Sequence, residues 1–476
     1  MRKTKIVCTI GPSSESPEML RKLIQAGMNV ARLNFAHGEL YEHAERIRRI
    51  REAAKELNQY VAVLLDIKGP EIRIGKMASD YAELVPGETV VLTTEEVPGT
   101  KDRIQVTYKQ LPQDVKPGSI ILIDDGLVRL EVVHAEGTEI TCLIKNGGKL
   151  KQRKGVNVPG VKTSLPGVTE KDVRHIKFGI EHNIDIIAQS FVRKAEDILE
   201  IKRILSEHKA GHIQVIAKIE NDEGVENLDA ILSVADGLMV ARGDLGVDLP
   251  VEDVPLVQKD MIRKCNLAGK PVITATHMLE SMQMNPRPTR AEAGDVANAI
   301  FDGTDSVMLS GESAAGKYPL ESVETMARIA ARAESVLGRH GRCSRKDDEA
   351  ATNVTSVIGE AVARTALVLS AKAILALTES GFTARMIAKH KPAAPVIAVS
   401  TKESVLYALS LTWGVTPLLR SVSASSTDAA IAAAVVLAKS AGYVQDGDLV
   451  VITAGVPAGC TGTTNLLRVH QVGESL

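Results

Sequence analysis

The sequence has few of the features that mark membrane, secreted or nucleic-acid-binding proteins. No apolar run approaches the roughly 18 residues that a membrane span needs, and the first residues lead into a strand pattern rather than a signal peptide. A net charge of −2, from 57 Lys and Arg against 59 Asp and Glu, supplies no field to recruit nucleic acid or an acidic membrane. The five cysteines are widely spaced and never form a C-x-x-C pair, which argues against a disulfide framework or a Cys-rich zinc site. We therefore expect a cytoplasmic protein with no membrane or nucleic-acid partner.

The composition is that of a globular protein, and its dominant pattern alternates short apolar runs with longer amphipathic stretches. The chain has 476 residues, of which 44% are hydrophobic and 24% charged. The apolar runs are Lys5–Ile10, Val30–Phe35, Val61–Ile67, Ile184–Phe191, Val215–Glu220, Leu238–Asp244, Val272–Thr276 and Ser306–Ser310. The clearest helical stretches are Glu18–Ala26, Glu42–Leu57, Glu196–His208 and Val254–Ala268. Eight such β-then-α units predict an α/β fold with a closed (β/α)8 TIM barrel. An open doubly wound sheet is the alternative, although no Gly-rich dinucleotide turn follows the first run.

More than a hundred residues separate the third and fourth predicted strands, which is too long for an ordinary connection. They contain short alternating runs divided by Gly-containing turns, which is typical of an all-β module. These runs are Thr89–Thr94, Arg103–Tyr108, Ile120–Asp124, Leu127–Val133 and Glu139–Ile144. We predict a β lid, residues 71–168, inserted after strand 3 and standing over the active-site face of a barrel formed by residues 1–70 and 169–338.

A charged linker at Arg339–Glu349 precedes a second α/β pattern. Its predicted strands are Ala373–Leu377, Val396–Ser400 and Leu449–Thr453, so residues 339–476 are expected to form a separate C-terminal α/β domain. The first of these strands leads into Thr378, Ser380, Gly381 and Thr383 at the start of a helix. Three hydroxyls and a Gly exceed what an N-cap needs, which predicts an anion-binding loop.

Polar residues two positions apart end six of the eight barrel strands. Residues i and i+2 of a strand face the same side, so each pair is expected to point into the barrel mouth. The pairs are Arg32/Asn34, Asp66/Lys68, Lys218/Glu220, Arg242/Asp244, Thr274/Thr276 and Ser310/Glu312. Such convergence of both signs of charge predicts an active site there.

The types of these residues indicate phosphoryl or enolate chemistry. Glu220 and Asp244 are hard carboxylates, which suit Mg²⁺ or Mn²⁺. Arg32, Lys218 and Arg242 would bring positive charge beside that metal. A barrel-strand lysine can also form a Schiff base in an aldolase, but the carboxylate neighbours of Lys218 favour a charged amine that acts electrostatically.

The strings that contain these residues resemble the pyruvate kinase family. They follow one another in order from residue 3 to about residue 470, and the family has the same barrel, β lid and C-terminal α/β domain. The strings are Met28–Gly38, Asp66–Arg73, Lys218–Asn221, Met239–Gly246, Thr276–Ser281, Arg287–Glu292 and Met308–Glu312. The chain ends near residue 476, so the extra C-terminal domain of some bacterial members is expected to be absent.

The resemblance implies a glycolytic phosphotransferase that converts phosphoenolpyruvate and ADP to pyruvate and ATP. In that reaction Lys218 would stabilise the phosphoryl group and the enolate oxygen, and Arg32 would hold the phosphate. Glu220 and Asp244 would bind Mg²⁺ or Mn²⁺. The carboxylate of the substrate would contact Gly243, Asp244 and Thr276, and the proton would reach carbon through water from Thr276 or Ser310, with Glu312 behind them.

The resemblance also implies a nucleotide site, a K⁺ site and an effector site. Arg73, His37 and Lys154 match positions that contact the nucleotide phosphates, and Glu71 marks K⁺-requiring members. The K⁺ ligands match Asn34, Asp66 and the carbonyl of Ile67, but Ala36 stands where a serine hydroxyl is usual, so weaker K⁺ binding is expected. The Thr378–Thr383 loop resembles one that binds a sugar phosphate or AMP.

Relatives of this kind are mostly homotetramers, and the same assembly is implied here. A catalytically silent sugar-phosphate sensor is a further alternative, against which the intact set of Arg32, Lys218, Glu220 and Asp244 argues.

Overall fold

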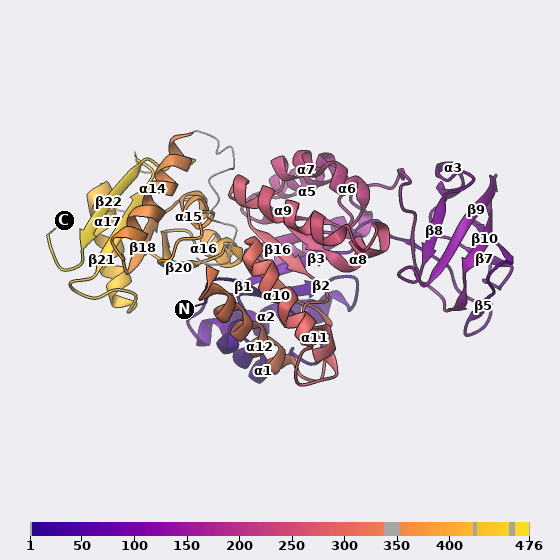
Figure 1. Ribbon diagram of the computed structural model, residues 1–476, viewed down its shortest axis with the longest axis horizontal. Helices are drawn as coiled ribbons and strands as arrows, with labels where there is room; N and C mark the ends of the chain where they lie inside the picture. The colour runs from indigo at the N-terminus through magenta and orange to yellow at the C-terminus, as the bar shows by residue number, and fades with distance from the viewer. Residues whose placement is uncertain (1, 338–352, 422–425, 457–461, 476) are drawn as a thin grey trace.

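The computed structural model describes residues 2–337, 353–421, 426–456 and 462–475, and it contains three bodies in a row. Figure 1 shows a barrel at the centre, an all-β body on one side of it and an α/β body on the other. The predicted linker at 339–349 lies outside the described residues. No helix in the described ranges is long and apolar enough to cross a membrane.

Eight parallel strands close the barrel, in the spatial order β1-β17-β16-β15-β14-β13-β3-β2. They are β1 (Lys5–Thr9), β2 (Val30–Asn34), β3 (Ala62–Ile67), β13 (Ile186–Gln189), β14 (Gln214–Ile219), β15 (Gly237–Ala241), β16 (Val272–Ala275) and β17 (Ser306–Leu309). All eight predicted strands are confirmed, and closure of the sheet excludes the open doubly wound alternative.

The barrel strands are apolar throughout because both of their faces are covered. Alternate residues fill the barrel interior, as Val30, Leu64 and Ile216 do, while their neighbours pack against the outer helices. Those helices are α1 (Pro17–Ala26), α2 (Leu40–Glu56), α4 (Glu170–Glu181), α5 (Ala195–Glu207), α7 (Leu228–Val234), α9 (Val254–Ala268), α10 (Arg290–Asp302) and α12 (Pro319–Glu334). Shorter helices near the carboxyl ends of the strands are α6 (Asp222–Glu226), α8 (Arg242–Asp248), the 3₁₀ turn η1 (Glu280–Gln283) and α11 (Gly311–Ala314).

The lid leaves the barrel after β3 and returns before α4, so it stands at the carboxyl end of the strands (Figure 1). Its main sheet has the order β4-β12-β8-β9-β10-β6-β7, and β11 pairs with β5 separately. The strands are β4 (Ile72–Arg73), β5 (Ala82–Leu84), β6 (Thr89–Thr93), β7 (Arg103–Gln105), β8 (Ile120–Ile123), β9 (Val128–Glu136), β10 (Glu139–Asn146), β11 (Gly148–Leu150) and β12 (Gly155–Asn157), with one helical turn, α3 (Leu111–Asp114). The sequence did not predict β4, β5, β11 and β12, each of which has only two or three residues. The lid boundaries at 71 and 168 stay a prediction.

The C-terminal body is a five-stranded sheet in the order β20-β19-β18-β21-β22, with β22 antiparallel to β21. Its elements are α14 (Val354–Val368), β18 (Ala373–Leu377), α15 (Phe382–Ala388), β19 (Val396–Ser400), α16 (Glu403–Ala408), η3 (Leu409–Leu411), β20 (Val415–Leu419), α17 (Thr427–Ser440), β21 (Leu449–Ala454) and β22 (Leu466–Gln471). The three predicted strands are confirmed, and β20 and β22 are additional.

This C-terminal body covers the amino end of the barrel. Lys5 at the start of β1 donates to the carbonyl of Val415 at 2.6 Å, and the hydroxyl of Ser306 at the start of β17 donates to Leu411 at 3.0 Å. Leu411 itself is fully buried among the side chains of the barrel interior. The carboxyl end, under the lid, is therefore the end of the barrel that remains for a site.

Candidate active site

The charged residues of the barrel mouth form a layer directly above the apolar interior. Arg32, Asp66 and Lys218 lie two residues after members of that interior layer, so strand alternation points them inward. All three are buried, with 9%, 2% and 8% of their surface exposed. Buried charges of this kind must be paired, and here they pair with one another.

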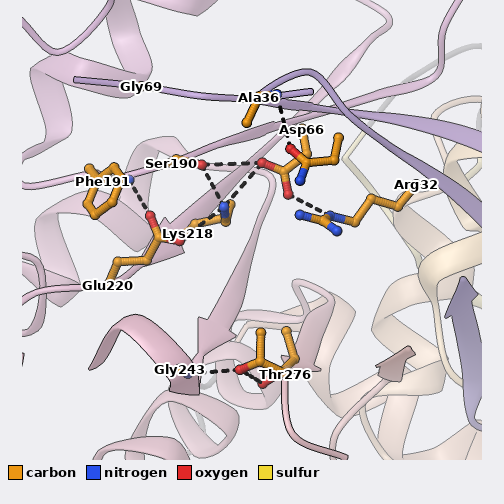
Figure 2. Close-up of polar contacts among 12 residues, drawn as sticks. Arg32, Ala36, Asp66, Gly69, Ser190, Phe191, Lys218, Glu220, Gly243 and Thr276 are labelled. Carbon is orange, nitrogen blue, oxygen red and sulfur yellow. Dashed lines mark hydrogen bonds and ion pairs between the residues drawn. The ribbon is translucent and has the colours of Figure 1, made fainter. Parts of the chain in front are cut away.

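Asp66 is the centre of the resulting network, which Figure 2 shows. Its Oδ2 accepts from Arg32 Nε at 2.7 Å, and its Oδ1 accepts from Lys218 Nζ at 3.1 Å. Lys218 Nζ also lies 3.0 Å from Glu220 Oε1. Three side chains from separate strands, together with Glu220 directly after β14, are thus joined by direct ion pairs.

The network sets the ionisation of its members. Burial by itself lowers the pKa of Lys218, but the carboxylates of Asp66 and Glu220 outweigh burial and raise the pKa above its ordinary value. Burial likewise works to raise the pKa of Asp66, yet Arg32 and Lys218 hold it below its ordinary value. Lys218 is therefore a charged ammonium, which suits electrostatic stabilisation and not the neutral amine of a Schiff-base aldolase.

Glu220 and Asp244 form the pair best suited to a divalent cation. Burial is the largest cause that raises both pKa values, and the charge of Asp244 raises the pKa of Glu220 further, to about 7. A dication would relieve this repulsion. The described residues contain no group of three or more His, Cys, Asp or Glu side chains able to hold a metal, so further ligands would be water or substrate oxygens, as Mg²⁺ prefers.

The structure brings the predicted substrate-binding residues Gly243 and Thr276 together. Thr276 Oγ1 accepts from the Gly243 N–H at 2.8 Å and donates to the carbonyl of Ala275 at 2.7 Å (Figure 2). Thr276 has a φ of +64°, a conformation that is costly for a β-branched residue and is found mainly at functional sites.

Ser310 follows β17 at the same end of the barrel, and Glu312 supports it. The Ser310 N–H donates to Glu312 Oε2 at 2.8 Å, and the Leu279 N–H donates to Oε1 at 3.1 Å. Glu312 is fully buried, and this burial raises its pKa.

The predicted K⁺ ligands are adjacent. Asn34 and Asp66 are register partners across β2 and β3, and Ile67 follows Asp66. The Ala36 N–H donates to Asn34 Oδ1 at 3.1 Å. The backbone of Ala36 therefore belongs to this cluster, although the Ala36 side chain offers no oxygen.

Two of the three predicted nucleotide residues lie together on the lid. Arg73 in β4 is the register partner of Gly155 in β12, which follows Lys154. Arg73 Nε donates to Glu71 at 2.6 Å, and Lys154 Nζ lies 2.8 Å from Asp124. The third, His37, is exposed and lies on the barrel itself, in the loop between β2 and α2.

Comparison with known proteins agrees with this arrangement. The family model of the pyruvate kinase barrel domain matches residues 1–323, and that of the pyruvate kinase α/β domain matches residues 356–470. The chain is 57% identical to a pyruvate kinase of Geobacillus stearothermophilus and 56% identical to those of Bacillus licheniformis and Staphylococcus aureus. In each case the match covers 100% of this chain and 81% of the relative. The chain belongs to the pyruvate kinase family. It is thus an enzyme of the transferase class.

Two sequence predictions for this pyruvate kinase family site were wrong. Arg242 was expected to point into the mouth with Asp244. Because β15 ends at Ala241, before both residues, strand alternation does not apply to them. Arg242 instead turns to α10, where its Nη1 lies 2.6 Å from Asp295. Thr274 faces outward between the strands and helices, where its hydroxyl bonds to that of Thr304 at 2.9 Å. Neither residue reaches the charged layer.

Sequence reasoning missed contacts that come from the two barrel strands without a polar pair. Thr9, at the end of β1, accepts from Arg32 Nη1 at 2.8 Å. Ser190, directly after β13, accepts from Lys218 Nζ at 2.5 Å. Each is a single hydroxyl residue at a strand end, and that position was the available signal.

The lid contributes a further residue that the sequence did not reveal. Asp125, in the turn after β8, is close enough to Asp244 for its charge to raise the pKa of Asp244, although burial is the larger cause. At the next residue, a Cβ on Gly126 would lie 3.9 Å from Val247 Cγ1 in α8. The lid turn therefore lies next to the helix that carries Asp244.

The predicted effector loop forms one side of a pocket in the C-terminal body. Thr378, Ser380 and Thr383 line it together with Arg420 and other residues. Gly381 has a φ of +79° at the start of α15, a conformation that favours glycine. Three of the four predicted residues line this pocket, and the fourth, Gly381, lies within the same loop.

Proposed function

We propose that the chain transfers the phosphoryl group of phosphoenolpyruvate to ADP and then protonates the enolate, which yields pyruvate and ATP in glycolysis. The observation that carries this proposal is the buried, charged Lys218 between Asp66 and Glu220, beside a carboxylate pair able to hold a dication. Phosphoryl transfer passes through a loose transition state and depends mainly on positioning and charge neutralisation, which this layer can supply.

Arg32 and Lys218 would bind the phosphoryl oxygens from one side of the mouth. Arg32 is supported for this role because Thr9 and Asp66 hold its Nη1 and Nε, which fixes the guanidinium plane. Glu220 and Asp244 would hold Mg²⁺ or Mn²⁺, which would neutralise charge on the transferring group. The N–H groups of Gly243 and Asp244 and the hydroxyl of Thr276 would orient the substrate carboxylate.

Protonation of the enolate would proceed from Thr276 or Ser310 through water. Glu312 supports the Ser310 side because its carboxylate is buried behind that residue and holds its backbone. Lys218 would keep the enolate oxygen negative until the proton reaches carbon.

ADP would bind between barrel and lid, with Arg73, His37 and Lys154 on its phosphates. K⁺ would bind at Asn34, Asp66 and the Ile67 carbonyl. Because Ala36 lacks a hydroxyl, a water must complete the K⁺ shell, and we expect weaker K⁺ binding than in a serine-containing relative.

The pocket of Thr378, Ser380, Gly381 and Thr383 would bind a sugar phosphate or AMP as an allosteric effector. Arg420 supports this assignment because it adds a positive charge to the pocket lining. We further propose that the enzyme acts in the cytoplasm as a homotetramer. Its described cysteines Cys8, Cys142 and Cys265 are buried free thiols, as a reducing compartment would maintain them.

The test is ³¹P NMR of the protein with phosphoenolpyruvate, ADP, Mg²⁺ and K⁺, with each component omitted in turn. We expect ATP from the complete mixture, none without Mg²⁺ and less without K⁺, and we expect Ala36→Ser to reach half-maximal rate at a lower K⁺ concentration. Folded protein that makes no ATP, even with fructose 1,6-bisphosphate, ribose 5-phosphate or AMP added, would refute the proposal. Trapping of Lys218 by borohydride in the absence of metal would instead indicate an aldolase.

A further inference from the structure

We propose that the turn formed by Ser190 and Phe191 is a positioning element that holds Lys218 and Glu220 as one unit. The turn directly follows β13, and it contacts the transition-state lysine through a hydroxyl and the metal carboxylate through a backbone N–H (Figure 2). The inference rests on the proposed function, which assigns those two roles to Lys218 and Glu220. It adds Ser190 and Phe191, to which the proposed function gives no role.

The Ser190 hydroxyl links the two charged partners of the layer. It accepts from Lys218 Nζ at 2.5 Å and donates to Asp66 Oδ1 at 3.2 Å. Ser190 is only 4% exposed, so no bulk water competes for these bonds. A hydroxyl in this position fixes the ammonium group without adding a third negative charge that would weaken its pull on a phosphoryl oxygen.

The Ser190 hydroxyl accepts one of the three hydrogen bonds that the Lys218 ammonium group can donate. An ammonium group has three N–H donors, and three acceptors surround Nζ, namely Asp66 at 3.1 Å, Glu220 at 3.0 Å and Ser190 at 2.5 Å. When Glu220 serves as a metal ligand, its hold on Nζ weakens. Asp66 and Ser190 then keep two donors fixed and direct the third into the mouth.

The Phe191 backbone performs the matching task for Glu220. Its N–H donates to Glu220 Oε2 at 2.6 Å, which leaves Oε1 on the side of Lys218. Phe191 has a φ of +55°, a left-handed conformation that is strained for a bulky residue. Such strain persists because the surrounding contacts hold the turn, and it aims the N–H at the carboxylate.

Gly69, after β3, packs directly on this turn. A Cβ at Gly69 would lie 2.6 Å from the carbonyl oxygen of Ser190, and Gly69 has a φ of +69°. The segment that follows the Asp66 strand therefore packs against Ser190, which itself bonds to Asp66. These contacts make the turn part of the same rigid unit.

The first experiment compares Ser190→Ala, Ser190→Thr and a matched control. We expect Ser190→Ala to lower kcat roughly 10- to 100-fold with little change in KM for phosphoenolpyruvate, because the lost interaction acts in the transition state. Ser190→Thr, which keeps the hydroxyl, should recover most of kcat. The control is Ser322→Ala in α12, and it should leave kcat unchanged. Ser322 is also a buried serine, but its hydroxyl donates to the backbone carbonyl of Tyr318, at 2.7 Å. Wild-type kcat in Ser190→Ala, or a Thr variant as slow as the Ala variant, would overturn the role of Ser190.

The second experiment needs no turnover. Phe191→Gly keeps the N–H but frees the backbone, so we expect about tenfold weaker Mn²⁺ binding by electron paramagnetic resonance, whereas Ser190→Ala should bind Mn²⁺ like the wild type. A crystal structure of Ser190→Ala should show Nζ displaced from Asp66. Equal Mn²⁺ affinity in Phe191→Gly, or an unmoved Nζ, would overturn the proposal. If wild-type protein makes no ATP, the proposed function fails while these two readouts still decide the role of the turn.

Discussion

Asp66→Asn is the substitution that most directly tests the charged layer. Asp66 is 2% exposed and offers two oxygens, one to Arg32 at 2.7 Å and the other to Lys218 at 3.1 Å and Ser190 at 3.2 Å. Asparagine has the same shape but replaces one oxygen with an NH₂ group. Whichever way the amide turns, a donor will face a donor.

The expected loss has two parts. Removing one partner of a buried ion pair typically costs about 3–5 kcal/mol, because the other charge stays buried without compensation. Here Arg32 loses its carboxylate partner, whereas Lys218 loses Asp66 but keeps Glu220. Arg32 and Lys218 also lose the group that holds them in register, and a misplacement of about 1 Å can cost about 10²-fold in rate. We therefore expect a lower denaturant midpoint and a kcat/KM for phosphoenolpyruvate reduced by about two orders of magnitude.

The matched control is Asp185→Asn at the amino end of the same barrel. Asp185 is also buried and lies 2.8 Å from Arg51, and its carboxylate accepts from the Val63 N–H at 2.7 Å. This variant should lose stability by a similar mechanism and keep its kcat/KM. If Asp66→Asn keeps wild-type midpoint and kcat/KM, or if both variants lose activity equally, the charged layer is not what organises the site.

Two further predictions concern the Gly69 turn and the contact between barrel and C-terminal body. Gly69→Ala should weaken Mn²⁺ binding and lower the melting temperature more than Gly118→Ala does. Both glycines have a positive φ, but only at Gly69 would the added Cβ meet a close atom. Equal effects of the two variants in melting scans and Mn²⁺ titrations would rule out the clash. Burial, and secondly the charge of Arg2, lowers the pKa of Lys5 from 10.5 to about 7. Above pH 7 the folded protein therefore holds Lys5 neutral, and unfolding takes up a proton. The stability of the wild type should then rise with pH until Lys5 is neutral in the unfolded state as well. Any gain in melting temperature of Lys5→Met over the wild type should therefore shrink between pH 7 and pH 9.5, and a constant difference would contradict the assigned pKa.

The barrel strands and most of the charged layer could be predicted from the sequence alone. Each barrel strand is a continuous apolar run, because both faces are buried, and such runs are visible without any knowledge of their neighbours. Strand alternation was enough to place Arg32, Asp66 and Lys218 on one inner face. It failed for Arg242, since α8 begins there and turns the side chain toward Asp295.

The contacts between residues of different strands and bodies became visible only in the folded structure. Ser190 and Lys218 are 28 positions apart and Arg32 and Asp66 are 34 apart, so no local pattern reports their contact. The short lid strands are defined by their pairing, β4 with β12 and β12 also with β8, and a strand of two or three residues carries little periodic signal of its own. The docking of Leu411 at the amino end of the barrel likewise depends on the tertiary structure, because the interior side chains that it packs against come from separate strands of the closed sheet.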